Sequence, residues 1–399
     1  MTAAVDPPPP GVDDRTYYTE RVWCPWIEQA MPLAGATMLE YGCGPGSVSR
    51  AFAPRVERHI GLDIHQPSVD IARRMAREAG QENSEFHAHP PEEIIDVFKG
   101  YAGQVDIVML YAVIEHLTVR ERIEVLAAAR EVARPNGVIV VIELPNRLVA
   151  WDHHSTWMPF INQLPEPLSL DYLMARGTRP ALRENVLRAR DPDLPAEADQ
   201  DALLALERFG RGGSFHEFEL AWGGRIDGYV VASNWGPDVL PHREIDPGEL
   251  PLARLMARLR PDLDPPFSRQ WIDLILRPDL PVRRGPFHRP WVGNAGPGSH
   301  AISRNLDEVV FVPAPEGVLH VELPEPTRRL AVRVVDGETH TVVEATTLQG
   351  ERATGEAPGR PGRARSVVID LPDWADDVEI RLPRGGWIPA LTYLGHGPG

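Results

Sequence analysis

Three glycines, Gly42, Gly44 and Gly46, alternate with other residues between an apolar run and a helical pattern. Because glycine has no Cβ, such a loop can turn tightly and lets a ligand approach its backbone. A second apolar run, His59–Leu62, ends at Asp63. In an open α/β sheet, a carboxylate about 20 residues after the first glycine reaches the ribose hydroxyls of a bound adenosine. The spacing therefore predicts a site for a nucleoside-containing ligand, and it differs from that of a triphosphate-binding P-loop.

Side chains that could take a proton from a second substrate lie farther along the chain. Asp152 and His154 stand in a D-x-H arrangement, and an Asp–His pair can act as orienter and general base. His116 occupies the loop expected after the fourth strand, and His216 lies in a short alternating run. Because histidine suits proton transfer near neutral pH, all four are candidate catalytic residues. Structural alternatives stay open: Asp152 as a helix cap, His116 as a loop contact, and His216 as a buried, satisfied histidine.

No metal site is expected from the sequence. Asp152, His153 and His154 are adjacent, so their side chains do not easily converge on one ion, and the spacing of a two-histidine, one-carboxylate site is missing. The chain has two cysteines, Cys24 and Cys43, which alone cannot form a zinc site or a disulfide framework. A reducing cytoplasm is therefore the expected compartment.

The elements that must position these residues follow from alternating apolar runs and helical patterns over about residues 34–145. The runs typical of strands are Ala36–Glu40, His59–Ile64, Ser84–Ala88, Val105–Val113 and Val138–Leu144. The helical segments between them are Ser47–Ala53, Pro67–Gly80, Pro91–Gly103 and Thr118–Gly137, the last with a Thr118/Glu121 capping box. This alternation predicts βαβ units in a doubly wound, mostly parallel α/β sheet. Two of three later runs would complete seven strands: Ser214–Ala221, Tyr229–Asn234 and Gln270–Leu276.

The remaining segments differ in composition. Residues 146–213 interrupt the α/β pattern and are expected to form a helical insertion over the site. Residues 300–399 hold seven short β-type runs separated by Pro, Gly and Asp, which predicts a small all-β sandwich domain. We therefore expect a disordered lead over residues 1–15, an α/β domain over 16–290 and the β-sandwich over 300–399.

Composition excludes several classes of partner. The 399 residues include 41 Lys and Arg against 57 Asp and Glu, a formal net charge of −16. Nucleic acids and anionic membrane surfaces are bound by basic surfaces, so neither is an expected partner. A membrane span is not expected either, because the sequence has no run of about 18 apolar residues.

The segments LEYGCGPG and IGLDIHQPSVDIAR resemble the first two motifs of class I S-adenosylmethionine-dependent methyltransferases. VDIVMLYAVIEHL and EVARPNGVIVVIELPNR resemble the fourth and fifth strands of that family with their flanking loops. The later P-N-R-L…D-x-H segment resembles a subset of bacterial glycan and natural-product methyltransferases. The resemblance implies a Rossmann-like methyltransferase fold with S-adenosyl-L-methionine as cofactor. It implies these cofactor-binding residues: Glu40, Gly42, Gly44 and Gly46 at the methionine half, Asp63 at the ribose, Ile64 at the adenine, and Tyr111 and Ala112 near the sulfonium.

The expected activity is methyl transfer to an oxygen of a sugar or another small-molecule natural product, with a His/Asp general base. Transfer to nitrogen or carbon, transfer of another group from the cofactor, and a non-catalytic scaffold are the alternatives. The C-terminal β domain is expected to support a homodimer, dock a carrier or bind a glycan.

Overall fold

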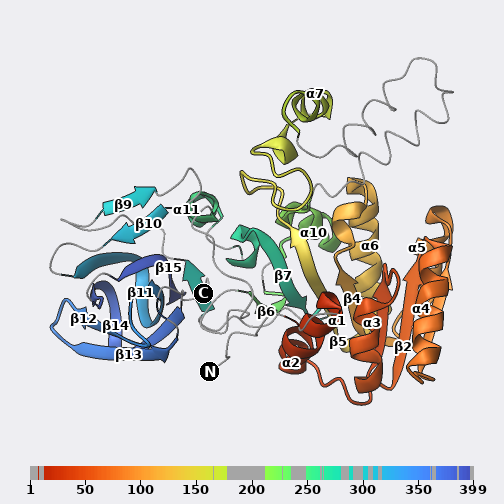
Figure 1. The fold of residues 1–399 in the computed structure, drawn as a ribbon, viewed down its shortest axis with the longest axis horizontal. Helices are drawn as coiled ribbons and strands as arrows, with labels where there is room; N and C mark the ends of the chain where they lie inside the picture. The colour runs from red at the N-terminus through yellow and green to blue at the C-terminus, as the bar shows by residue number, and fades with distance from the viewer. Residues whose placement is uncertain are drawn as a thin grey trace. The chain divides into compact units, whose positions relative to one another are not determined.

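The computed structural model describes residues 8, 13–164, 166–177, 212–226, 228–234, 249–260, 263, 265–279, 287–290, 300–303, 309–312, 317–359, 361, 365–383 and 386–395 (Figure 1). The chain divides into two compact units. The first combines Ala3–Ser233 with Gln270–Val282, and the second combines Asn234–Arg269 with Arg283–Gly399. The segment between residues 234 and 269 therefore groups with the C-terminal strands.

In its described part, the first unit contains a seven-stranded sheet of order β3-β2-β1-β4-β5-β7-β6. Its strands are β1 (Thr37–Tyr41), β2 (Arg58–Asp63), β3 (Ser84–Ala88), β4 (Val105–Tyr111), β5 (Ala133–Pro145), β6 (Val230–Ser233) and β7 (Trp271–Leu276). The pairs among β1 to β5 are parallel, whereas β7 runs antiparallel to both β5 and β6. The doubly wound, mostly parallel sheet predicted from the sequence is confirmed.

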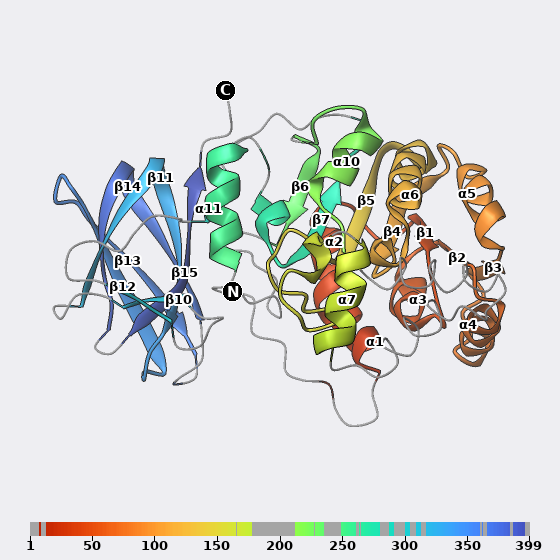
Figure 2. The same ribbon diagram turned by 90° about the horizontal axis from the view of Figure 1, so that it is seen from above.

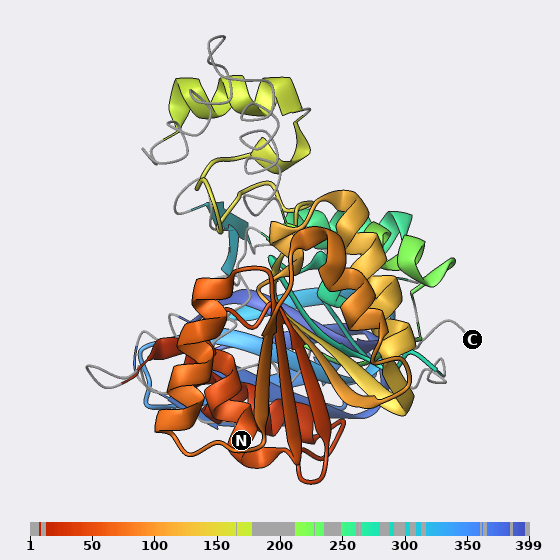
Figure 3. The same cartoon turned by 90° about the vertical axis from the view of Figure 1, so that its right-hand side faces the viewer.

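Helices cover both faces of this sheet (Figures 2 and 3). The described helices of the unit are α1 (Asp14–Tyr18), η1 (Thr19–Trp23), α2 (Cys24–Glu28), α3 (Ser47–Phe52), η2 (Ala53–Arg55), α4 (Gln66–Glu78), α5 (Pro91–Lys99), η3 (Ile114–His116), α6 (Val119–Val132), η4 (Ile161–Gln163), α7 (Glu166–Arg176) and α10 (Phe215–Trp222). Figure 2 shows α1, α3 and α4 on one face and α5, α6 and α10 on the other. The expected Thr118/Glu121 capping box begins α6. None of the helices in the described ranges is long and apolar enough to cross a membrane.

Two local predictions need correction. Ser214–Ala221 is not a strand, because Ser214 and Glu217 form a capping box that begins helix α10. The Ser and Glu side chains of this S-x-x-E motif bind backbone N–H groups at the start of the helix. This stabilises a helix more than the short alternating pattern favours a strand. Helix α1 also begins inside residues 1–15, which were expected to be disordered. Asp13 accepts a hydrogen bond from the Thr16 backbone N–H at 2.7 Å, and α1 begins at Asp14.

The second unit is built on antiparallel strands. Those described are β8 (Phe287–Pro290), β9 (His300–Ser303), β10 (Val309–Val312), β11 (Val318–Val335), β12 (His340–Thr347), β13 (Arg352–Pro358), β14 (Arg365–Arg381) and β15 (Trp387–Gly395), with helices α11 (Leu250–Leu259) and η6 (Pro265–Ser268). They form one eight-stranded sheet, where the sequence predicts a sandwich of seven short strands. Long strands β11 and β14 each join two of the predicted runs, since the interruption near Thr327 is absorbed by register shifts.

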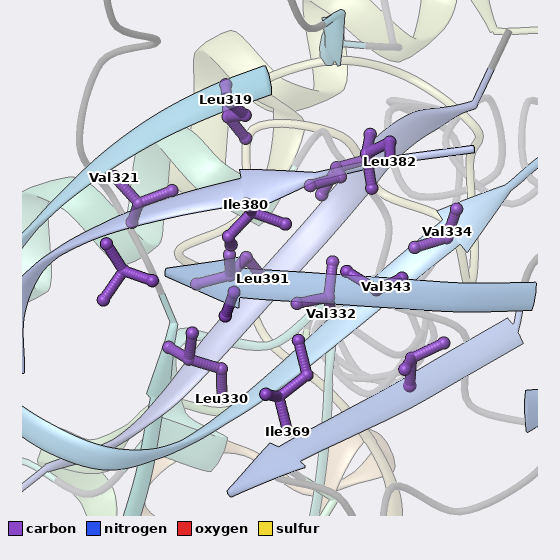
Figure 4. Packing of buried hydrophobic residues seen from close by; sticks show 14 of the residues in the cluster. Leu319, Val321, Leu330, Val332, Val334, Val343, Ile369, Ile380, Leu382 and Leu391 are labelled. Carbon is purple, nitrogen blue, oxygen red and sulfur yellow. The ribbon is translucent and has the colours of Figure 1, made fainter. Parts of the chain in front are cut away.

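The sheet of the second unit folds back over one apolar core. Figure 4 shows Leu330, Val332, Val343 and Ile380 among the side chains that fill it. Strand β13 is separated from β14 by β12 in the strand order, yet a Cβ on Gly355 of β13 would lie 2.2 Å from the Val368 carbonyl oxygen of β14. The curvature of the sheet therefore brings non-neighbouring strands together.

Candidate active site

The glycine loop joins β1 to α3 at the carboxyl edge of the sheet. Gly42, Gly44 and Gly46 have φ values of 84°, 51° and 86°, a region that residues with a Cβ rarely enter. A Cβ at Gly42 would lie 2.5 Å from Val113 Cγ2, so a larger residue would clash with Val113 at this position. A Cβ at Gly44 would meet nothing within 4 Å. The space beside Gly44 is therefore open, and the predicted approach of a ligand to this loop stays a prediction.

Asp63 ends β2 and contacts that loop directly. Its Oδ2 accepts a hydrogen bond from the Gly44 backbone N–H at 2.7 Å, and its Oδ1 accepts one from the His65 N–H at 2.8 Å. The next side chain, Ile64, is 48% exposed. The Asp63 carboxylate lies beside the glycine loop, which suits the ribose-binding role that the resemblance implies for it. The exposed Ile64 side chain suits the implied contact with the adenine.

Glu40 lies inside the fold behind the glycine loop. Its Oε2 accepts a hydrogen bond from the Ser49 hydroxyl at 2.6 Å and lies 3.4 Å from His59 Nε2. Both Glu40 and His59 are almost fully buried. In the described structure, Glu40 thus ties β1 to α3 and β2, which holds both flanks of the loop. Its contact with the methionine half of the cofactor stays a prediction.

The N-terminal helix lies against the ends of β4 and β5. The hydroxyl of Tyr111 donates a hydrogen bond to Glu143 Oε1 at 3.0 Å. The Arg15 guanidinium from α1 lies 5.2 Å from the centre of the Tyr111 ring and 3.6 Å from Glu143 Oε2. The Thr16 hydroxyl donates to the Ser47 carbonyl at the start of α3. Helix α1 therefore contacts both the start of α3, which follows the glycine loop, and Tyr111, which is expected to lie near the sulfonium.

Two residues at this edge have unusual backbone geometry. Ala112 and Glu143 have φ values of 48° and 60° although both carry a Cβ. Their backbone N–H groups are fixed by the Ile142 carbonyl at 2.9 Å and by the buried Asp273 carboxylate at 2.8 Å. Strained backbone that surrounding contacts hold in place is common at functional sites. The prediction that Ala112 lies near the reacting group agrees with this strain.

A cluster of three ionisable side chains forms beyond β4. Glu115 and His116 come from η3, and His154 comes from the segment after β5. Glu115 Oε1 lies 3.7 Å from His116 Nε2 and 3.8 Å from His154 Nε2. The two imidazole rings have their centres 5.6 Å apart. The structure therefore brings two predicted catalytic histidines together around a carboxylate that the sequence analysis missed.

Glu115 is fully buried, and neither of its carboxylate oxygens accepts a hydrogen bond from another described residue. Burial, reinforced by the Glu143 carboxylate, raises the pKa of Glu115 to about 8, although its own backbone N–H, Arg122 and Arg15 act in the opposite direction. The only sequence signal for Glu115 was its place beside His116 in a loop already expected to hold chemistry. A carboxylate in such a position is normally exposed, so its burial was not predictable.

Arg122 fixes the loop that carries this cluster. Its guanidinium donates hydrogen bonds to the carbonyls of Leu117 at 2.8 Å and Glu115 at 3.3 Å. It also lies 3.7 Å from the buried Glu217 carboxylate, which is 3.2 Å from Arg147. Helices α6 and α10 are thereby joined to η3, and the backbone of Glu115 is held in one position.

Asp152 binds the backbone of its own loop, and its pairing with the His154 ring as orienter and base stays a prediction. The Asp152 carboxylate accepts hydrogen bonds from the backbone N–H groups of His154, Ser155 and Thr156. The Thr156 hydroxyl donates a further one at 2.6 Å. Short acidic side chains that bind the backbone a few residues ahead stabilise tight turns. Asp152 therefore shapes the loop, and Glu115 is the carboxylate that faces the His154 imidazole.

His216 lies in the first turn of α10 and is exposed. The predicted burial of His216 depended on a strand that the structure replaces with a helix. Cys43 is buried, and burial raises the pKa of its thiol well above the usual range. A protonated, buried thiol is a poor nucleophile, which agrees with a packing role for Cys43.

Comparison with known proteins finds relatives for one part of the chain. The model of the family described as "Methyltransferase domain" matches residues 38–137. The ubiquinone biosynthesis O-methyltransferase of Aromatoleum aromaticum is 31% identical over 114 residues, which are 29% of this chain and 46% of that protein. The enzyme of the same name from Acinetobacter baylyi is 32% identical over 113 residues, 28% of this chain and 45% of that protein. The chain therefore spans about half the length of the curated relatives it matches.

Solved structures give weaker similarities. The YcgJ protein of Bacillus subtilis has a TM-score of 0.32 and 19% identity, covering 52% of this chain and 69% of that one. A SAM-dependent methyltransferase of Methanosarcina mazei has a TM-score of 0.27 and 19% identity, covering 31% and 58%. The sequence similarity to methyltransferases therefore covers residues 38–137 of the chain.

Proposed function

We propose that this chain transfers the methyl group of S-adenosylmethionine to a hydroxyl oxygen of a small molecule, a sugar or another natural product. One relationship carries the proposal. Val113 packs against Gly42 in the cofactor loop, and Glu115 follows only two residues later in the sequence. The cluster of Glu115, His116 and His154 is thus attached to the same short loop that packs against the cofactor site.

For this reaction the protein must position the two substrates and remove one proton from the acceptor. A bound S-adenosylmethionine would supply an activated methyl group: attack by the acceptor oxygen would form a C–O bond and leave the electrons of the C–S bond on sulfur. Catalysis then depends on positioning and on removing the hydroxyl proton. Tyr111 and Ala112 lie at the end of β4, just before the cluster. A methyl donor above these residues would face an acceptor bound at the cluster.

Aromatic side chains around the cluster support an organic acceptor. The ring centre of His154 lies 5.8 Å from that of Trp271. The ring centre of His153 lies 6.3 Å from that of Trp151 and 6.0 Å from that of Trp157. The Trp157 side chain is 54% exposed. Tryptophan offers a flat apolar face with a polar edge, which suits sugars and aromatic rings. The curated relatives are named O-methyltransferases, which supports oxygen over nitrogen or carbon.

The parts of the chain outside the matched region would set specificity and assembly. We propose that residues 16–290 carry the reaction and that residues 146–213 help to select the acceptor, since His154 comes from this segment. The C-terminal β-rich unit would support a homodimer or dock the acceptor's carrier. A cytoplasmic location suits the cofactor and the two reduced, buried cysteines.

The test combines binding and product analysis. Calorimetric titration with S-adenosylmethionine and S-adenosylhomocysteine should show micromolar binding at one site. Incubation with methyl-labelled cofactor and a panel of hydroxylated sugars and phenols should yield labelled product and S-adenosylhomocysteine. Binding without transfer to any oxygen acceptor, but with transfer to amines, would replace the oxygen proposal by an N-methyltransferase. Failure to bind either ligand would favour a non-catalytic scaffold.

A further inference from the structure

The spacing inside the cluster of Glu115, His116 and His154 does not match direct hydrogen bonding. Glu115 Oε1 lies 3.7 Å and 3.8 Å from the two imidazole nitrogens, and hydrogen bonds between nitrogen and oxygen are normally 2.7–3.2 Å long. The three groups nevertheless converge, with one ligand atom from each lying within 4.8 Å of the others. The Glu115 carboxylate thus faces two imidazole nitrogens across gaps longer than a hydrogen bond, which leaves room for an atom between them.

We propose that Glu115, His116 and His154 bind one divalent transition-metal ion through a carboxylate oxygen and two imidazole nitrogens. Zinc–ligand bonds are about 2.0–2.2 Å long, so tetrahedral neighbours lie about 3.3 Å apart. The two separations from the Glu115 carboxylate exceed this value by about half an ångström, which small side-chain rotations can close. A carboxylate with two imidazoles suits Zn²⁺, Mn²⁺ or Fe²⁺ better than Mg²⁺ or Ca²⁺, which prefer oxygen ligands.

The burial of Glu115 is an independent reason for a cation. Its side chain is 0% exposed, and both carboxylate oxygens lack a hydrogen-bond donor from another described residue. A buried, ionised carboxylate is strongly destabilising unless a positive charge compensates it. Arg122 is nearby, but its guanidinium bonds to the backbone carbonyls of Glu115 and Leu117 and not to the carboxylate. A metal ion would supply both the charge and the missing partner.

The cluster is also accessible to a metal ion from solvent. The side chains of His116 and His154 are 51% and 27% exposed, so one side of the cluster opens to solvent while Glu115 closes the other. Three protein ligands leave coordination positions for water or substrate, as in catalytic metal sites. Arg122 holds the backbone of Glu115 in place, and such support around a ligand improves metal affinity.

This inference deepens the proposed function and rests on it only for the identity of the acceptor. The acceptor hydroxyl would occupy an open metal position, where the ion lowers its pKa and stabilises the alkoxide. The hydroxyl proton passes to solvent, the oxygen attacks the methyl carbon, and the sulfonium becomes a neutral thioether. Acceptors with two neighbouring oxygens, such as vicinal diols and catechols, would fill two open positions and should be preferred.

Metal binding can be measured without the reaction. The untagged full chain, stripped with EDTA and dialysed, would be titrated with Zn²⁺ and with Co²⁺, whose visible absorption reports nitrogen and oxygen coordination. We expect about one equivalent bound, and a loss of at least about 10-fold in affinity for Glu115→Gln and for His154→Asn. His116→Asn is the second variant, because this half-exposed side chain tolerates replacement. His153→Ala, which removes a neighbouring histidine outside the cluster, is the matched control and should bind normally.

Two results would overturn the metal site: no stoichiometric binding by the folded wild type, or equal binding by the Glu115→Gln and His153→Ala variants. The proposed methyl transfer can fail separately. Methyl transfer that continues unchanged in EDTA would remove the metal from the mechanism and return His154 to the role of general base. Stoichiometric metal and cofactor binding without transfer to any acceptor would instead contradict the proposed function alone.

Discussion

The carboxylate of Asp152 accepts a hydrogen bond from the Thr156 backbone N–H at 2.7 Å. Together with its bonds to the N–H groups of His154 and Ser155, this contact makes Asp152 the anchor of a buried turn. The turn delivers His154 to the carboxylate of Glu115. We therefore expect separate functions for two residues that look like a catalytic pair in the sequence, one structural and one at the site.

Asp152→Ala and His154→Ala should separate these functions. Removal of the Asp152 carboxylate leaves buried N–H groups unpaired, which should cost about 2–4 kcal/mol and lower Tm by about 5–10 °C. Replacement of the partly exposed His154 should change stability by less than about 1 kcal/mol but lower kcat by about 100-fold or more. Thermal unfolding and single-turnover rates measure the two effects. Equal losses of Tm in both variants would contradict the division.

Gly44→Ala should weaken cofactor binding without unfolding the protein. The matched control is Gly35→Ala, because both glycines have positive φ and open space where a Cβ would stand. Each substitution should cost about 1–2 kcal/mol of backbone strain. Only the Cβ at position 44 would project toward the bound ligand, so only this variant should lose affinity for S-adenosylhomocysteine in calorimetry. A similar loss in Gly35→Ala would mean that strain, and not contact, explains the effect.

Asp63→Ala should lower affinity for S-adenosylmethionine by about 100-fold, because two hydrogen bonds from the ribose to a charged acceptor disappear. The chain should remain folded, since Asp63 lies at the end of β2 and its protein partners are backbone groups of the loop. Asp70→Ala, on the exposed side of α4 beside Gln66, is the control. Normal binding by Asp63→Ala would show that the ribose lies elsewhere.

The sheet of the first unit was predictable because apolar runs alternate along the chain with helical patterns, and turn signals separate the two. The strand predicted at Ser214 failed because eight residues are too few for periodicity to compete with a capping box. In the second unit, Pro324 and Pro326 beside Thr327 suggested a break between strands, but a long antiparallel strand absorbed it by a register shift. Local signals in short segments do not reveal which neighbour a strand finally pairs with.

The contact between the glycine loop and Asp63 was predictable for a related reason. Gly42, Gly44 and Asp63 belong to one β-α-β unit, whose geometry is fixed by local spacing. The cluster of Glu115, His116 and His154 was not predictable, because Glu115 and His154 come from loops after different strands and meet only in the folded sheet. The sequence lacks the spacing of a two-histidine, one-carboxylate site, yet the fold assembles those three side chains.

The stability of the metal-free protein should depend on pH through Glu115. Its pKa is about 8 in the folded chain and 4.5 in the reference state, and burial is the main cause. Below about pH 4.5 the carboxyl is protonated in both states and contributes nothing. As the pH rises toward 8, the unfolded chain releases its proton first, so the folded state loses stability relative to the unfolded state. Above about pH 8 the loss is complete.

Glu115→Gln isolates this contribution because glutamine has nearly the same shape and no charge. After EDTA treatment, the difference in Tm between Glu115→Gln and the wild type should be small at pH 5 and should grow in favour of the variant by several degrees at pH 8. Differential scanning calorimetry of both proteins at the two pH values gives the measurement. Added Zn²⁺ should reverse the order at pH 8, because the ion stabilises only the wild-type carboxylate. A pH-independent difference would mean that Glu115 stays ionised in the folded chain and that nearby arginines already compensate its charge.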